Sequence, residues 1–276
     1  MRQPKTTRTA AGQAGTGRVT VRDVLRNTDL RALDGEVLLA SVLKRPRSWL
    51  LAHPDAPVPR AVCQRFAVLA ARRGTGEPVA YLTGRKEFYG REFAVCEDVL
   101  CPRPDTEALV ERILKAVRPG DVVFDIGTGS GCVGVTVVLE RPDVSAILTD
   151  VSEAALKVAE RNARRLGAKV RTVPADGLPG EASAVDPKRL VIAGNLPYLD
   201  ASNPSPPFEP SVALDGGPDG LQVIRALVMQ LRERALAPRH LLLEHGESQG
   251  AAVRDLLGPR ARTSPDLAGN DRVTGY

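Results

Sequence analysis

Residues 122–131 read VVFDIGTGSG. The apolar run 122–126 predicts a buried strand, and the glycines that follow mark the turn into a helix over 131–140. Glycines at this point let the backbone pass close to a ligand, because no Cβ stands in the way. Their spacing is G-x-G-x-G, and no Lys-Ser or Lys-Thr pair follows, so the turn is not a P-loop.

Strands and helices alternate regularly after this turn. Apolar runs predict strands at 146–149, 170–173, 190–193 and 240–243, and helical spacing predicts helices over 153–166, 221–236 and 249–256. A helix over 108–117 precedes the first strand, and we expect a hairpin at the C-terminal end. This order predicts an α/β fold built on a doubly wound, Rossmann-like sheet.

Two carboxylates follow the next two strands. Asp150 stands 23 residues after Gly127, where it can accept hydrogen bonds from both ribose hydroxyls of an adenosine. Asp176, after the third strand, can reach the adenine amino group. Since the carboxyl ends of parallel strands converge, these groups predict a nucleotide crevice. NAD uses the same geometry, so the choice between ligands depends on the fourth strand.

That strand, 190–193, leads through a glycine into N-L-P-Y at 195–198. Asn195 brings a side-chain carbonyl, and the backbone carbonyl of Leu196 is held in place because the residue before a proline is extended. Tyr198 brings a flat ring. Together they could hold a planar amino group, although a strand that simply ends in a turn with a buried tyrosine is the plain alternative. A dehydrogenase has no need of this motif, whereas a methyltransferase acting on a planar nitrogen does.

The chain divides into four predicted parts. Residues 1–18 form a flexible basic tail, because they are rich in Thr, Ala, Gly and Arg and contain no acidic residue. Residues 19–75 have the periodicity of a small helical N-terminal domain. Residues 76–104 form a hairpin linker, and 105–276 form the catalytic domain.

Composition excludes several classes of protein. The 276 residues include 43% hydrophobic residues and carry a net charge of +5, which is ordinary for a globular protein. No apolar run approaches the roughly 20 residues of a membrane span. The four cysteines form no C-x-x-C pair and the chain has three histidines, so we expect no metal site and free thiols in the cytoplasm.

Further short motifs accompany the glycine turn and 195–198. They lie at 76–84, 88–90, 102–107, 208–210, 213–221, 243–246, 249–250 and 271–273. In all these segments the chain resembles the HemK family of release factor glutamine N5-methyltransferases, which are class I S-adenosylmethionine-dependent methyltransferases. The resemblance covers nearly everything after the tail.

The resemblance implies methyl transfer from S-adenosylmethionine, leaving S-adenosylhomocysteine, to the side-chain amide of a glutamine. In the family this glutamine lies in the Gly-Gly-Gln motif of class I peptide chain release factors. We expect a monomer that binds neither a membrane nor a stable nucleic acid. Cofactor binding is assigned to Asp125, Gly127, Thr128, Gly129, Ser130, Gly131, Asp150, Asp176, Gly177 and Asn195. Catalysis and substrate binding are assigned to Asn195, Leu196, Pro197 and Tyr198.

Two departures from the family pattern concern the acceptor side. The family has Asn-Pro-Pro-Tyr, and Leu196 replaces the first proline. Leucine keeps the backbone carbonyl but adds an N–H and loses rigidity, so we expect activity to be retained. The segment 199–207, where the target peptide should enter, is shorter than usual.

Three alternatives stay open on sequence alone. An adenine-N6 DNA methyltransferase also presents Asn-Pro-Pro-Tyr to a planar amino group, but it needs a domain that reads a duplex. A non-catalytic module could bind a release factor or the cofactor without turnover. A glutamine methyltransferase could also act on a different protein.

Overall fold

The computed structural model describes residues 18–203 and 206–276. The chain separates into two compact units, with the division between Val79 and Ala80. The predicted tail lies outside the described residues except for Arg18. Within the described part, no helix has the length and apolar character needed to cross a bilayer.

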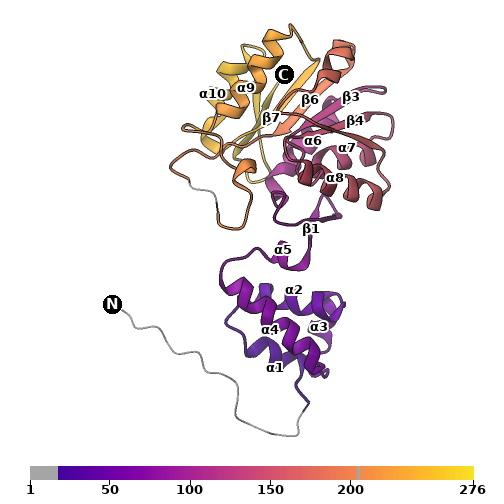
Figure 1. Ribbon diagram of the computed structural model, residues 1–276, viewed down its shortest axis with the longest axis vertical. Coiled ribbons are helices and arrows are strands. Elements are labelled where there is room, and N and C mark those ends of the chain that lie inside the picture. Colours follow the sequence, from indigo (N-terminus) through magenta and orange to yellow (C-terminus); the bar gives the residue numbers. More distant parts are fainter. Residues whose placement is uncertain (1–17, 204–205) are drawn as a thin grey trace. The chain divides into compact units, whose positions relative to one another are not determined.

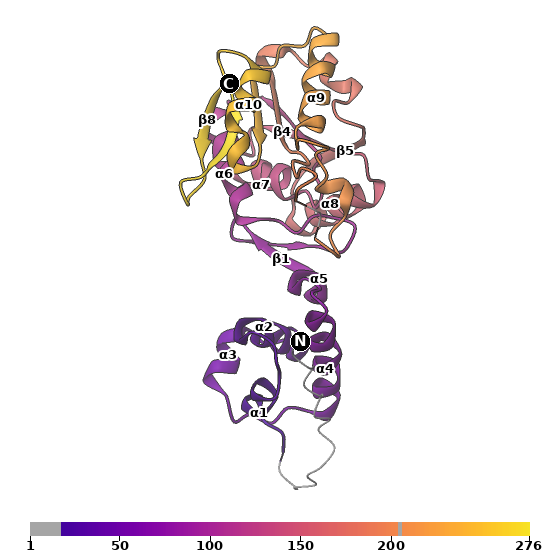
Figure 2. The ribbon, with the colours of Figure 1, turned by 90° about the vertical axis from the view of Figure 1, so that its left-hand side faces the viewer.

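In its described residues, the N-terminal unit consists of helices packed around a small core (Figures 1 and 2). The helices are α1 (Val21–Arg26), α2 (Ala32–Leu43), α3 (Arg47–Ala52) and α4 (Arg60–Gly74). Thr20 begins α1, where its hydroxyl accepts a hydrogen bond from the N–H of Asp23 at 3.2 Å. The core of the unit contains the buried side chains Leu38, Leu39, Leu50 and Phe66.

A hairpin belongs to the core of the second unit. The short helix α5 (Val79–Thr83) leads into β1 (Arg85–Phe88) and β2 (Arg91–Ala94), which pair antiparallel. Phe88 and Phe93 meet edge to face, with ring centroids 6.0 Å apart. They pack in one cluster with apolar side chains of the helix α6 (Glu107–Ala116). The hairpin within the predicted linker thus packs into the core of the second unit.

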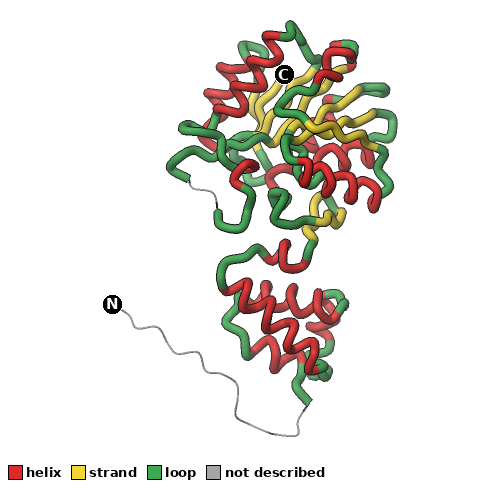
Figure 3. The backbone as a smooth tube through the Cα atoms, viewed as in Figure 1, coloured by secondary structure: helices red, strands yellow, loops and turns green. Residues whose placement is uncertain are grey.

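The second unit is built on a seven-stranded sheet (Figure 3). Its strands are β3 (Val122–Ile126), β4 (Ser145–Asp150), β5 (Val170–Pro174), β6 (Leu190–Asn195), β7 (His240–Glu244), β8 (Arg262–Pro265) and β9 (Asp271–Gly275). Their order is β5-β4-β3-β6-β7-β9-β8, with β3 to β7 parallel and the hairpin β8–β9 antiparallel at one edge. The predicted doubly wound sheet and its C-terminal hairpin are confirmed.

Helices cover both faces of this sheet. With α6, the helices α7 (Cys132–Glu140) and α8 (Glu153–Leu166) pack on one face, and α9 (Gln222–Glu233) and α10 (Gly250–Leu257) on the other (Figure 1). Side chains of β6 alternate between the two cores: Val191 joins the first, and Leu190 and Ile192 join the second. Such double burial explains why the strand is a continuous apolar run.

The strand order reverses next to β3. The chain runs from β3 outward through β4 to β5 and then returns to place β6 on the other side of β3. Connections that leave in opposite directions open a crevice at the carboxyl ends of these two strands, which is where open α/β sheets bind ligands.

Candidate active site

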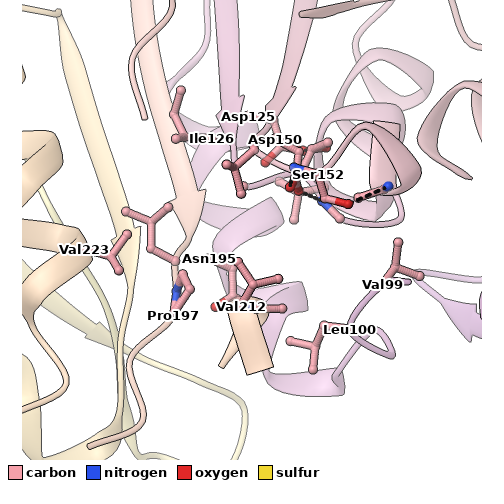
Figure 4. Close-up of a pocket in the computed structure, with 18 of the residues that line it drawn as sticks. Val99, Leu100, Asp125, Ile126, Asp150, Ser152, Asn195, Pro197, Val212 and Val223 are labelled. Atoms are coloured by element: carbon pink, nitrogen blue, oxygen red, sulfur yellow. Dashed lines mark hydrogen bonds between the residues drawn. The ribbon is translucent and has the colours of Figure 1, made fainter. Parts of the chain in front are cut away.

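A pocket of about 200 Å³ lies at this crevice. Figure 4 shows Asp150 and Ser152 from one strand end, and Asn195 and Pro197 from another, around the same space. Its walls come from separate stretches of the chain: residues 98–103, 125–130, 150–152, 175–177, 195–197 and 212–213, with Thr106, Cys132, Val133, Ala155, Val223, Ala226, Leu227 and Gln230. The residues assigned to the cofactor and those assigned to the acceptor therefore share one pocket, apart from Gly131 and Tyr198.

The glycine turn is fixed by a buried carboxyl group. Oδ2 of Asp125 accepts hydrogen bonds from the Thr128 hydroxyl at 2.6 Å and from the N–H of Gly134 at 2.9 Å. Burial raises the pKa of Asp125 to about 6. These bonds hold the loop between β3 and α7 in one shape.

Two of the glycines are required by the backbone. Gly127 has φ +67°, and a Cβ there would also lie 3.3 Å from Cδ2 of Leu196. Gly131, at the N-terminus of α7, has φ +81°, and a Cβ would come within 3.1 Å of Ala159. Gly131 therefore lets α7 pack closely on α8 and does not face the pocket. Gly127 thus lies close to the side chain of Leu196, the residue that follows Asn195.

Asp150 is held at the end of β4 by backbone donors. Its Oδ2 accepts from the N–H of Gly129 at 2.9 Å, and its Oδ1 accepts from the N–H of Ser152 at 2.9 Å. The carboxylate thus links the glycine turn to the start of α8. Each oxygen keeps a second lone pair, so it can still accept a ligand hydroxyl.

The turn after β5 is supported by a residue that the sequence did not single out. Gln230 of α9 donates from Nε2 to the carbonyl of Asp176 at 3.1 Å and accepts at Oε1 from the N–H of Leu178 at 2.7 Å. Gly177 between them has φ +76°, and a Cβ would lie 2.5 Å from Oε1 of Gln230. No local signal marks a glutamine on a neighbouring helix.

Asn195 ends β6 with its carboxamide in a defined orientation. Its Nδ2 donates to Oγ1 of Thr106 at 3.0 Å. Among the described residues, none donates to Oδ1 of Asn195 or to the backbone carbonyl of Leu196. No described residue therefore occupies the two oxygens that we expected to clamp a planar nitrogen, and both residues line the pocket. The Leu196 side chain is buried.

Tyr198 is placed differently from its two neighbours. It is not part of the pocket wall, and its hydroxyl lies 3.5 Å from Oε1 of Glu244 at the end of β7. Burial raises the pKa of Tyr198 to about 12. Its backbone carbonyl accepts from Nε2 of Gln249 at 3.0 Å, which ties the motif to the segment before α10.

The segment 98–103 was also missed as part of the site. We expected it to belong to a linker, yet Val99, Leu100 and Arg103 line the pocket (Figure 4 labels the first two). Arg103 donates to Oε2 of Glu209 at 2.5 Å, so it joins this wall to the loop after Tyr198. Among the described residues no His, Cys, Asp and Glu cluster could hold a metal ion.

Two family models match the chain. The model of the PrmC N-terminal domain matches residues 20–84, and the model of the methyltransferase small domain matches residues 104–193.

Solved structures share the fold at low identity. The hMettl16 catalytic domain, in complex with MAT2A 3′UTR hairpin 6, has a TM-score of 0.54 at 13% identity over 82% of this chain and 85% of that one. A methyltransferase from Pyrococcus furiosus has a TM-score of 0.50 at 18% identity over 74% and 94%. At this identity the likeness supports the methyltransferase fold alone.

Curated relatives are much more similar. Proteins named release factor glutamine methyltransferase are 41% identical in Neisseria gonorrhoeae, over 89% of this chain and 93% of the relative, and 42% identical in Pseudomonas aeruginosa, over 88% and 91%. The protein of that name in Bordetella pertussis is 41% identical over 92% and 98%. Similarity of this extent covers both units. The chain belongs to the family of release factor glutamine methyltransferases.

Proposed function

We propose that this enzyme transfers a methyl group from S-adenosylmethionine to the side-chain amide nitrogen of the glutamine in the Gly-Gly-Gln motif of class I peptide chain release factors. The observation that carries the proposal is that Asn195 and Leu196 line the same pocket as Gly127 and that, among the described residues, none donates to Oδ1 of Asn195 or to the Leu196 carbonyl. The names of the curated relatives support glutamine over adenine as the acceptor.

The residues around the pocket fit S-adenosylmethionine. Gly127 leaves the space that a Cβ would fill, Asp150 offers carboxylate oxygens for ribose hydroxyls, and Val223 and Leu227 offer an apolar wall for an adenine ring. Asp176 would accept from the adenine amino group. When bound, the cofactor supplies a methyl group made electrophilic by its positively charged sulfur.

The residues that would bind the glutamine act by orienting its side-chain amide. An amide nitrogen is a poor nucleophile because its lone pair is shared with the carbonyl group, so correct placement carries much of the rate. Asn195 would accept one N–H of the glutamine and the Leu196 carbonyl the other. Both bonds would strengthen as positive charge grows on the nitrogen, which is where preorganised acceptors stabilise a transition state. Tyr198 follows the pocket-lining Pro197 but is not itself in the wall, and we propose that its ring packs near the amide plane of the bound glutamine.

The protein substrate would enter along the loop after Tyr198. Arg103 and Val212 line the pocket there, and the ion pair between Arg103 and Glu209 fastens the loop. We further propose that the helical residues 19–75 recognise the release factor. The enzyme would then act as a monomer in the cytoplasm, where release factors function.

Mass spectrometry of a co-expressed release factor tests this function. The expected result is one added methyl on the glutamine of its Gly-Gly-Gln motif with the wild-type enzyme, and none with Asn195→Ala. Methylation of duplex DNA without modification of the release factor would instead identify an adenine methyltransferase. Methylation of a glutamine in a different protein would support glutamine methylation as the reaction but would show that the release factor is not the substrate.

A further inference from the structure

Two residues outside the assigned site lie behind Asn195. Oγ1 of Thr106, in the turn before α6, accepts from Nδ2 of Asn195 at 3.0 Å and donates to Oε1 of Glu244 at 3.2 Å. Thr106 and Glu244 are both buried. Residues separated by 138 positions in the sequence thus form one chain of hydrogen bonds that ends at the pocket.

The donor and acceptor groups of these three side chains fix the direction of both hydrogen bonds. An ionised carboxylate can only accept, so the single proton of the Thr106 hydroxyl points to Glu244. The hydroxyl oxygen can then only accept from Asn195, which requires the NH₂ end of the carboxamide to face it. In the opposite flip, Oδ1 would meet the lone pairs of Thr106 and the NH₂ group would face the reacting nitrogen.

We propose that Thr106 and Glu244 are positioning residues that keep the carboxamide oxygen of Asn195 turned toward the substrate nitrogen. This inference rests on the proposed function of the same site. It gives a reason for a fully buried carboxyl group that does not itself line the pocket but contacts Thr106, which does.

A second observation concerns the remaining oxygen of the carboxyl group. Oε2 of Glu244 is buried and has no hydrogen-bond partner among the described residues. Burying a carboxylate with an unpaired oxygen costs free energy. If Glu244 only stabilised the fold, a neutral side chain would serve better at this position. We therefore attribute the ionised carboxylate to orientation, since only a group that cannot donate imposes one direction on the hydrogen bonds.

Protonation of Glu244 should release this constraint. Burial raises the pKa of Glu244 to about 7. The charged and titratable groups that face it are Arg272 of β9, Asp105 beside Thr106, Tyr198 and Cys132. Arg272 stays charged, and the raised pKa values of Tyr198 and Cys132 keep both neutral near pH 7. A protonated Glu244 could donate to Thr106 and allow the opposite flip of Asn195.

Single-turnover methyl transfer at saturating cofactor tests the proposal. Thr106→Val removes the bridging hydroxyl and should lower the rate about tenfold, as the loss of one orienting hydrogen bond allows. Thr106→Ser should restore most of it. The matched control is Thr136→Val, because Thr136 is equally buried and its hydroxyl has no partner among the described residues. A rate for Thr106→Val equal to that of the control would overturn the inference.

The pH profile separates orientation from packing. The wild-type rate should fall as the pH drops below about 7, because Glu244 gains a proton. Glu244→Gln should be slower and nearly insensitive to pH across the same interval. A variant that keeps the wild-type profile would contradict the role of the charge.

A third measurement does not depend on methyl transfer. The side-chain NH₂ signal of Asn195, identified in NMR spectra by its loss in Asn195→Ala, should exchange slowly with solvent in the wild type and faster in Thr106→Val. Equal exchange in both would overturn the positioning role. An enzyme with a protected Asn195 that methylates no release factor would refute the proposed function and leave the orientation standing.

Discussion

Cδ2 of Leu196 lies 3.3 Å from the position that a Cβ of Gly127 would occupy. The turn that would hold the cofactor is thus so close to Leu196 that a side chain on Gly127 would touch the leucine. A change on either side should shift the other, because packed interiors leave little room to relax.

Gly127→Ala should therefore cost both stability and activity. The positive φ alone should cost about 1 kcal/mol in the free energy of unfolding, and the contact with Leu196 should displace the acceptor carbonyl. Gly167→Ala is the control: its φ is +75° but a Cβ would meet nothing within 4 Å. Urea unfolding should show a loss in both variants, whereas kcat should fall only in Gly127→Ala. Equal kcat values would show that the contact is not needed.

Leu196→Pro restores the family residue and should retain activity. The substitution keeps the backbone carbonyl but removes the N–H of residue 196, directly after the β6–β7 pairing of Asn195 with Glu244. The variant loses buried apolar contacts near Gly194 and Gly127, so unfolding should become easier by about 1 kcal/mol. Steady-state kinetics and thermal melting check both parts. Loss of turnover in a folded protein would show that the leucine itself is required.

Asp150→Asn should weaken cofactor binding. An asparagine has one acceptor oxygen, so it cannot serve the N–H groups of both Gly129 and Ser152 while also facing ribose hydroxyls. Loss of a charged hydrogen bond costs about 1.5–3 kcal/mol, which corresponds to a dissociation constant raised roughly 10- to 100-fold. Calorimetric titration with S-adenosylmethionine measures it. An unchanged affinity would remove Asp150 from the cofactor site.

Stability should depend on pH through Asp125. Its pKa is about 6 in the folded protein and near 4 when unfolded, so between these values the folded state binds more protons. The contribution of Asp125 to the free energy of unfolding therefore decreases by about 1–3 kcal/mol as the pH rises from about 4 to about 6. Asp125→Asn should lack this component. Urea unfolding of the wild type and of Asp125→Asn, measured between about pH 4 and pH 6, tests this direction. If the wild type became more stable relative to the variant as the pH rises, the prediction would be wrong.

The regular elements were predictable because their signals are local. An apolar run predicted β3 at 122–126, and the helical pattern over 153–166 predicted α8. Ser152 accepts from the N–H of Ala155, and Gly167 takes φ +75°, which are the expected start and stop of a helix. Burial of β6 on both faces explains its uninterrupted apolar sequence.

The supporting side chains were not predictable in the same way. Gln230 reaches Leu178 across 52 positions, and Thr106 reaches Asn195 across 89. Such bonds depend on how helices and strands come together, and no spacing along the chain encodes them. The place of residues 98–103 in the pocket wall was not predictable for a related reason: the sequence places them in the predicted linker, and only the fold brings them to the pocket.

The central claim is that Asn195 orients the acceptor nitrogen, and Asn195→Ala tests it most directly. Single-turnover transfer of labelled methyl from S-adenosylmethionine to a purified release factor should be roughly a hundredfold or more slower in this variant. Calorimetry of the same protein should give wild-type affinity for the cofactor. A rate close to that of the wild type, in a folded variant that binds the cofactor, would contradict the account.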